Sequence, residues 1–75
     1  MSLNDLKENK VAVVEKLEGD SRFVSRITSI GLTPGCNLRV VKNDKNRPML
    51  VYSRDTMIAL NRNECAGIEV REVAR

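Results

Sequence analysis

The side chains best suited to chemistry in this sequence are two cysteines and ten carboxylates, because the 75 residues include no histidine. Histidine is the usual general base near neutral pH and the commonest ligand of transition metals, so both roles lack their ordinary residue. Cys36 and Cys65 lie far apart in the sequence, without the CxxC spacing of a zinc or redox site. Each neighbours apolar residues, which favours two small buried side chains. A metal site formed by the two thiolates and nearby carboxylates is the alternative.

The carboxylates are scattered along the chain, and no group of them has the D-x-D-x-D-G-like spacing of a calcium loop. The phosphate-binding motifs GxxxxGK(S/T) and GxGxxG are absent, as is the GxSxG motif of serine hydrolases. The four glycines are explained as turn and cap residues. We therefore expect a protein that is not an enzyme, with no catalytic residues, no metal ligands and no cofactor.

Positive charge is concentrated in the middle of the chain, where residues 21–54 carry seven Lys or Arg and a single acid, Asp44. Such a segment suits nucleic acid, anionic lipid or an acidic protein. Single-stranded nucleic acid also needs aromatic rings for base stacking, and the chain has only Phe23 and Tyr52. We therefore expect protein–protein contact and no nucleic-acid partner, with RNA or DNA binding by the basic segment as the alternative. The candidate contact residues are Arg22, Arg26, Arg39, Arg47 and Arg54.

The elements that must position these cations begin with a helix in the segment 21–30. Four of its apolar residues recur at helical spacing and share one face, which we expect to be buried. They are Phe23, Val24, Ile27 and Ile30. Gly31 follows them, where a C-terminal cap needs positive φ. Pro34 and Gly35 then form a turn, since proline fixes φ and glycine permits the reversal.

The rest of the chain predicts short strands separated by turns. Alternating apolar residues and turn signals give strands at 10–17, 36–42, 48–52, 56–60 and 68–73, with one helical turn before the last strand. Short strands joined by short connections suit a small, strongly bent antiparallel barrel. We therefore predict a single all-β domain over residues 1–75: an SH3-like barrel of about five short antiparallel strands, with a helix inserted after the first strand.

The expected location follows from hydropathy. No apolar stretch approaches the roughly 20 residues of a membrane span. The opening MSLNDLKENK carries polar and acidic residues where a secretory signal would be apolar. We expect a cytoplasmic protein that does not insert into the membrane.

With these residues laid out, the sequence resembles one family, the FeoA domain of ferrous iron transport protein A. The resemblance lies in the segments SLNDLK, KVAVVEKLEG, RFVSRITSIGLTPG, NLRVVKN and MIALNRNECAGIEV, and RITSIGLTPG is the most specific of them. Gly31, Pro34 and Gly35 match the turn of the family. Ile27 matches an apolar position on its helix, and we count it among the expected contact residues.

The resemblance implies an SH3-like barrel and no catalytic residues. It implies a small cytosolic accessory or regulatory protein of ferrous iron transport, which contacts FeoB, the GTP-hydrolysing membrane transporter. Any association with iron comes from the family alone. The alternatives from other classes are a small barrel that binds a transition metal directly and one that binds nucleic acid.

Overall fold

The computed structural model describes residues 1–73 and contains five strands, two α-helices and one turn of 3-10 helix. In chain order these elements are η1 (Leu3–Asp5), β1 (Val11–Leu17), α1 (Ser21–Ser29), β2 (Asn37–Lys42), β3 (Met49–Ser53), β4 (Thr56–Leu60), α2 (Arg62–Ala66) and β5 (Ile68–Val73). Every predicted strand is present, with bounds that differ from the prediction by no more than one residue at either end.

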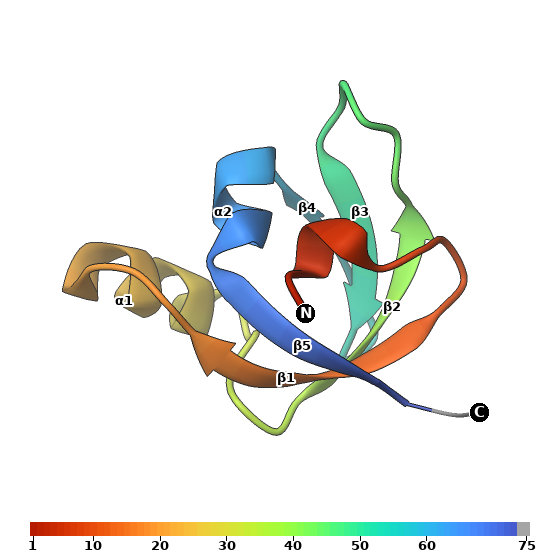
Figure 1. Ribbon diagram of the computed structural model, residues 1–75. Coiled ribbons are helices and arrows are strands. Elements are labelled where there is room, and N and C mark those ends of the chain that lie inside the picture. Colours follow the sequence, from red (N-terminus) through yellow and green to blue (C-terminus); the bar gives the residue numbers. More distant parts are fainter. Residues whose placement is uncertain (74–75) are drawn as a thin grey trace.

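The strands form one antiparallel sheet in the order β4-β3-β2-β1-β5. The sheet bends strongly, so that α2 and η1 lie over its concave side (Figure 1). β1 pairs with both β2 and β5 and is therefore central. The predicted fold class is confirmed: a small β-rich domain of five antiparallel strands with a helix after the first.

The core lies on the concave side because alternate residues of each strand point inward. On β1 these are Ala12 and Val14, and on β5 they are Ile68 and Val70, all with almost no exposed surface. The inward residues of the other strands and the apolar residues of the connecting segments complete the core: Leu3, Leu6, Ile27, Leu32, Cys36, Leu38, Val40, Met49, Val51, Leu60 and Cys65. The convex side of the sheet is left to face solvent.

Asp20 caps the N-terminus of helix α1, and its side chain accepts a hydrogen bond from the Phe23 amide at 2.9 Å. After the helix the chain turns at Gly31, which has a φ of 101° and donates its amide to the Thr28 carbonyl. Only one of the four residues on its apolar face, Ile27, is fully buried, while Phe23 and Val24 are half-buried and Ile30 is 41% exposed. The prediction that all four are buried is therefore wrong for Ile30. In Figure 1 the helix stands beside the sheet and does not lie across it. This position is consistent with the full burial of Ile27 alone among the four residues.

The hairpin between β3 and β4 turns through two residues, Arg54 and Asp55, which have φ values of 52° and 62°. A type I′ turn, which joins two antiparallel strands through only two residues, requires a positive φ at both of them. Glycine, asparagine and aspartate dominate such positions, so Asp55 suits its place in the turn, whereas arginine rarely adopts the positive φ of Arg54. The Tyr52 hydroxyl donates to the Asp55 carboxylate at 3.3 Å across the turn. Among residues 1–73, no helix has the length and apolar character that a membrane span requires.

Candidate interaction surface

The structure divides the six expected contact residues between the core, the helix and the sheet. Ile27 has no exposed surface and packs in the core, so the prediction that it contacts a partner is wrong. Ile27 is buried because, among the apolar residues at helical spacing on α1, it is the one that faces the sheet. The five arginines are all on the surface: Arg22, Arg26, Arg47 and Arg54 are exposed, and Arg39 is half-buried.

Two of the arginines lie on α1, and they differ in what they contact. Arg26 forms an ion pair with Glu64 of α2, whose side chain is only 13% exposed. Glu64 also accepts from the Asn61 amide at 3.0 Å in the capping box of α2, so Arg26 ties the two helices together. Arg22 lies at the exposed N-terminal end of α1 beside a shallow hollow that Phe23 also lines. Of these two, Arg22 is the one available to another molecule.

The other three arginines lie on the convex side of the sheet or near its turns. Arg54 occupies the β3–β4 turn, where its Cδ lies 4.0 Å from the position that a methyl group on Gly31 would take. A cation beside the C-terminus of α1 is favourable, because the carbonyl groups there carry partial negative charge. Arg39 points outward from β2 and places its guanidinium carbon 5.8 Å from the centre of the Tyr52 ring.

A continuous row of outward side chains crosses all five strands of the sheet. Its members pair directly from strand to strand, in the order Val73, Val11, Arg39, Tyr52 and Met57. Tyr52 is 37% exposed and Met57 is 54% exposed, which makes them two of the most exposed large apolar side chains in residues 1–73. The row is therefore apolar except for the single guanidinium at its centre.

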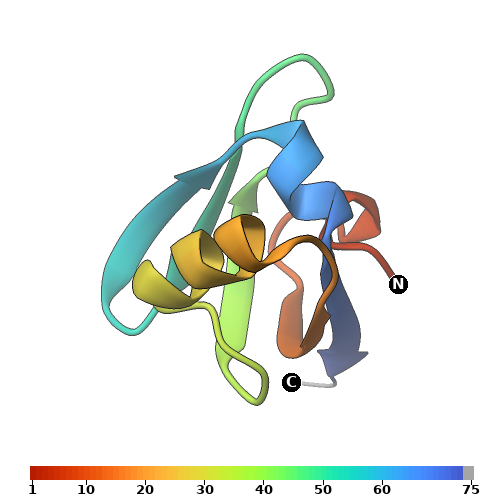
Figure 2. The ribbon, with the colours of Figure 1, turned by 90° about the vertical axis from the view of Figure 1, so that its left-hand side faces the viewer.

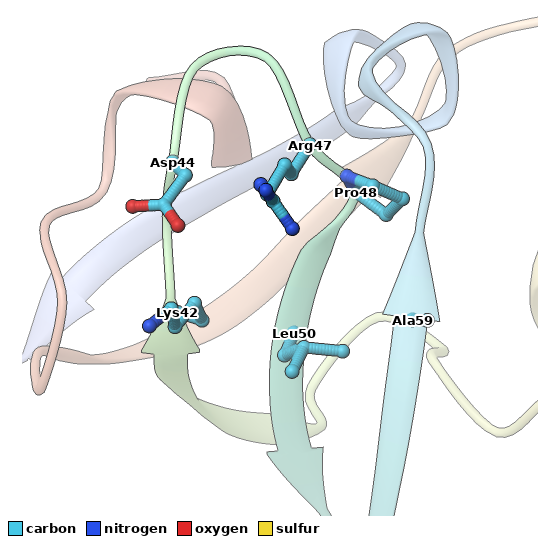
Figure 3. A pocket seen from close by; sticks show the side chains of 6 residues that line it. All are labelled: Lys42, Asp44, Arg47, Pro48, Leu50 and Ala59. Carbon is cyan, nitrogen blue, oxygen red and sulfur yellow. The ribbon is translucent and has the colours of Figure 1, made fainter.

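Beside this row, the convex face is hollowed between β2, β3 and β4. The hollow has a volume of about 540 Å³. Its lining residues are Lys42, Asp44, Arg47, Pro48, Leu50 and Ala59. Figure 3 shows Leu50 on β3 directed toward Ala59 on β4, with Lys42, Asp44 and Arg47 along the β2–β3 side. We call the outward row and this hollow together the convex-face patch; it joins an apolar floor to a predominantly cationic rim.

The β2–β3 loop that carries this rim is held by Arg62 of α2. The guanidinium of Arg62 donates to the Asn43 side chain at 2.6 Å, to the Asn4 side chain at 3.2 Å and to the Asp44 carbonyl. The Asn43 amide group in turn donates to the Leu6 carbonyl at 2.7 Å. Because all of these acceptors are neutral, Arg62 positions the loop without neutralising any carboxylate.

Ion pairing leaves the convex-face patch with unbalanced positive charge. The five ion pairs within the described residues involve the N-terminal ammonium, Lys10, Lys16, Arg26 and Arg71. Of the seven cations in residues 21–54, Arg26 alone has a carboxylate partner in the described part of the chain. Arg39, Lys42 and Arg47 therefore carry positive charge that no ion pair within residues 1–73 compensates, and they outnumber the one carboxylate of the patch, Asp44.

The cysteines and carboxylates, which could react or bind metal, do not come together in one site in the part of the chain that the structure describes. Within residues 1–73, no three His, Cys, Asp or Glu side chains lie close enough together to hold a metal ion. Cys36 and Cys65 are both buried free thiols, as the sequence indicates. Burial raises the pKa of the Cys65 thiol to about 11, which keeps it protonated at neutral pH. The Cys36 thiol lies 3.2 Å from the Ser53 hydroxyl.

Sequence reasoning found the cations of the patch but missed its apolar part. Leu50, Tyr52, Met57 and Ala59 lie on the convex face because they alternate with the buried residues of β3 and β4. That alternation was visible in the sequence. What the alternation does not reveal is which set of side chains on a strand points inward, since Leu50 is as apolar as Met49 and Val51, and Tyr52 is apolar over most of its ring.

Comparison with known proteins places the chain in a family. The model of the FeoA domain matches residues 1–72. A protein of Methanocaldococcus jannaschii, provisionally named Fe(2+) transport protein A, is 27% identical over 66 residues, which cover 88% of this chain and 79% of that protein.

Solved structures agree with this placement. The solution structure of FeoA protein from Chlorobium tepidum is 28% identical, with a TM-score of 0.88 over 99% of this chain and 71% of that chain. A crystal structure of an iron uptake regulatory protein (FeoA) gives a TM-score of 0.88 over 97% of this chain and 96% of that one, at 19% identity. A manganese-dependent transcriptional repressor shares the fold alone, with a TM-score of 0.90 at 17% identity over 36% of its length. These likenesses confirm the predicted SH3-like fold. The chain belongs to the FeoA domain family.

Proposed function

We propose that this protein is a small accessory protein of ferrous iron transport and that it acts by contact with the cytosolic, GTP-hydrolysing part of the membrane transporter FeoB. The observation that carries the proposal is the match of the FeoA domain model to residues 1–72, nearly the whole chain. Membership of this family supports a role in ferrous iron transport. A role through contact fits a domain of 75 residues that has little interior in which to build a deep substrate pocket.

The charge distribution supports contact as the mode of action. Cations without carboxylate partners in residues 1–73 lie on α1 and along the convex-face patch, and these favour a partner surface with negative charge. The apolar residues of the patch, led by Tyr52 and Met57, supply area that another protein can desolvate. In this arrangement the cations accelerate encounter and the apolar contacts hold the complex.

The test combines binding with transport. The purified chain is titrated against the cytosolic part of FeoB from the same source by biolayer interferometry, and uptake of ⁵⁵Fe(II) is measured in cells with and without the protein. We expect saturable binding and reduced uptake in the deletion strain, restored by a plasmid copy. Unchanged uptake together with no binding would remove the proposal.

A charge-reversed pair shows whether the basic segment takes part. Arg47→Glu removes an exposed cation of the patch, while Lys7→Glu removes an exposed cation outside residues 21–54 and serves as the control. We expect Arg47→Glu to slow association with the transporter several-fold at low salt, with a smaller effect of Lys7→Glu. Equal on-rates for the two variants would exclude the patch from the docking surface.

A further inference from the structure

The two edges of the sheet are treated differently by the fold. The edge strand β5 is covered by the start of the chain: Ser2 forms an antiparallel bridge with Glu69, and the Val70 amide donates to the Met1 carbonyl at 2.8 Å. β5 also carries charged residues, including Glu69 and Arg71, which discourage further pairing. This edge is therefore protected both by a neighbouring segment and by charge.

The other edge strand, β4, has neither form of protection in the described residues. It is the last strand in the sheet order, and Figure 2 shows it at one side of the sheet with no strand beyond it. Its sequence, TMIAL, contains no charge and no proline, and the side chains of Thr56, Met57 and Ala59 are exposed. An uncharged, exposed edge strand is the kind that accepts another strand.

The register of the β3–β4 hairpin identifies the backbone groups that are free to pair. Ser53 and Thr56 flank the two-residue turn and form a hydrogen-bonded pair. Because hydrogen-bonded and non-hydrogen-bonded pairs alternate along an antiparallel hairpin, the next hydrogen-bonded pair is Val51–Ile58. The alternation directs the amide and carbonyl groups of Met57 and Ala59 away from β3, toward the free edge. No backbone hydrogen bond of either residue outside the strands occurs in residues 1–73.

The surroundings of this edge select the chemistry of what binds there. Ala59 is the smallest outward side chain of β4 and borders the hollow, whose floor is Leu50 and Pro48. Lys42 and Arg47 line the same hollow and have no carboxylate partner within residues 1–73. A strand laid beside β4 would therefore bring its outward side chains to an apolar floor with a cationic rim.

We infer that β4 accepts an extended, acidic segment of another protein as a sixth strand of the sheet. The main chain of that segment pairs with the amide and carbonyl groups of Met57 and Ala59. An apolar side chain enters the hollow beside Ala59, and carboxylates two residues before and after it, which share its face of the strand, meet Lys42 and Arg47. The inference rests on the proposed function, which supplies the protein partner, and it names the surface and the form of the segment that the partner uses.

The other occupants fit this edge less well, each for a different reason. A second copy paired through β4 would place two sets of Lys42 and Arg47 on one continuous sheet face, where like charges repel. A single-stranded nucleic acid would need an exposed ring, and the one on this face, Tyr52, already has Arg39 over it. An anionic membrane has no extended main chain to pair with the free amide and carbonyl groups of Met57 and Ala59.

The test measures amide hydrogen exchange by NMR in the ¹⁵N-labelled full chain. The probe is the eight-residue peptide Thr-Glu-Thr-Val-Thr-Glu-Thr-Thr, whose Glu, Val and Glu side chains share one face of an extended strand, and the control is the same peptide with Lys in place of each Glu. We expect the acidic peptide alone to slow exchange of the Met57 and Ala59 amides at least tenfold, with chemical-shift changes at Leu50 and Tyr52. Shift changes without amide protection would mean contact with the face and not strand addition, and this would overturn the inference.

Variants at one position separate the backbone from the side chain. Ala59→Pro removes an amide that the hairpin does not use, so the chain should fold and lose peptide binding at least tenfold. Ala59→Glu, which keeps the amide but repels the acidic peptide, should lose binding by a similar factor and stands in if the proline variant does not fold. Ala59→Ser is the matched control and should bind within about threefold of the parent chain.

Each remaining outcome is decisive. Protection of Met57 and Ala59 that rises with protein concentration, without peptide, would assign the edge to a second copy and overturn the inference. Protection caused by phosphatidylserine vesicles and not by peptide would do the same. If the parent chain binds the transporter and Ala59→Pro binds it equally well, the proposed function stands and this inference fails. If the peptide protects the edge but the transporter does not bind, the proposed function fails instead.

Discussion

Truncating Ile27 tests whether this residue serves the core, as the structure places it, or a partner, as the sequence indicated. Its side chain has no exposed surface, and it is the only fully buried residue of α1. Ile27→Ala removes three carbon atoms from the core, and at about 0.8 kcal/mol per buried carbon the lost transfer free energy is about 2.4 kcal/mol. A cavity term adds to this, which gives a total loss of about 3–4 kcal/mol in the free energy of unfolding.

The assay is urea unfolding followed by circular dichroism, with Ile30→Ala as the control on the same helix. Ile30 is 41% exposed, so its truncation should cost less than about 1 kcal/mol. Ile27→Val, which removes a single carbon, should lose about 1 kcal/mol and gives a folded variant if the alanine variant is too unstable. If Ile27→Ala and Ile30→Ala unfold at the same urea concentration, α1 does not dock through Ile27 and the assignment of the core is refuted.

Three further predictions concern close approach, the loop anchor and a buried thiol. Gly67→Ala should lower the free energy of unfolding by about 2–3 kcal/mol, because the new methyl group would lie 2.6 Å from the Glu18 carbonyl oxygen. Gly35→Ala is the control in the same urea assay: the site has positive φ but open space, so the loss should be about 1 kcal/mol. Arg62→Ala should lower the free energy of unfolding by about 1–2 kcal/mol and speed amide exchange in the β2–β3 loop; unchanged exchange there would contradict its role as anchor. Folding raises the pKa of the Cys65 thiol from 9.0 to about 11. The free energy of unfolding is therefore unaffected by this group below pH 9 and falls as pH rises from 9 through 11, with a loss of about 1.4 kcal/mol at pH 10. The Cys65→Ala variant should lack this component of the loss of stability, and parallel pH profiles of variant and parent would contradict the shift.

The strands were predictable because alternation and turn residues agree along this chain. Asn9 is one example: it follows Glu8 in the turn before β1, where its φ of 69° uses the tolerance of asparagine for that region. The turn at Arg54 and Asp55 was located, but its two positive φ values were not, since arginine rarely adopts positive φ even though aspartate tolerates it. That conformation is imposed by the pairing of β3 with β4, which periodicity in a single strand does not reveal.

The candidate surface was predictable in its charges and not in its apolar part. Arginines stand out in a sequence because they are rarely buried without a partner, so Arg39 and Arg47 were identified. Ile27 was misplaced because a helical repeat gives the apolar face but not the part of that face that reaches the core. Ile30 lies on the same face and is exposed, since α1 meets the sheet at its rim.

The cations around β4 have a consequence for the molecule on its own as well as for its partner. An uncharged edge strand exposes a domain to pairing with copies of itself, and proteins usually place a lysine or a proline on such a strand. β4 has neither, but Lys42 and Arg47 line the hollow beside its outward face, and Arg54 lies in the turn that precedes it. The repulsion among these cations opposes self-pairing and does not oppose a segment of opposite charge. The edge of β4 is therefore selective for strands of negative charge. Neutralising Arg47 and Arg54 together should weaken binding of an acidic strand and, at the same time, favour self-association of the protein.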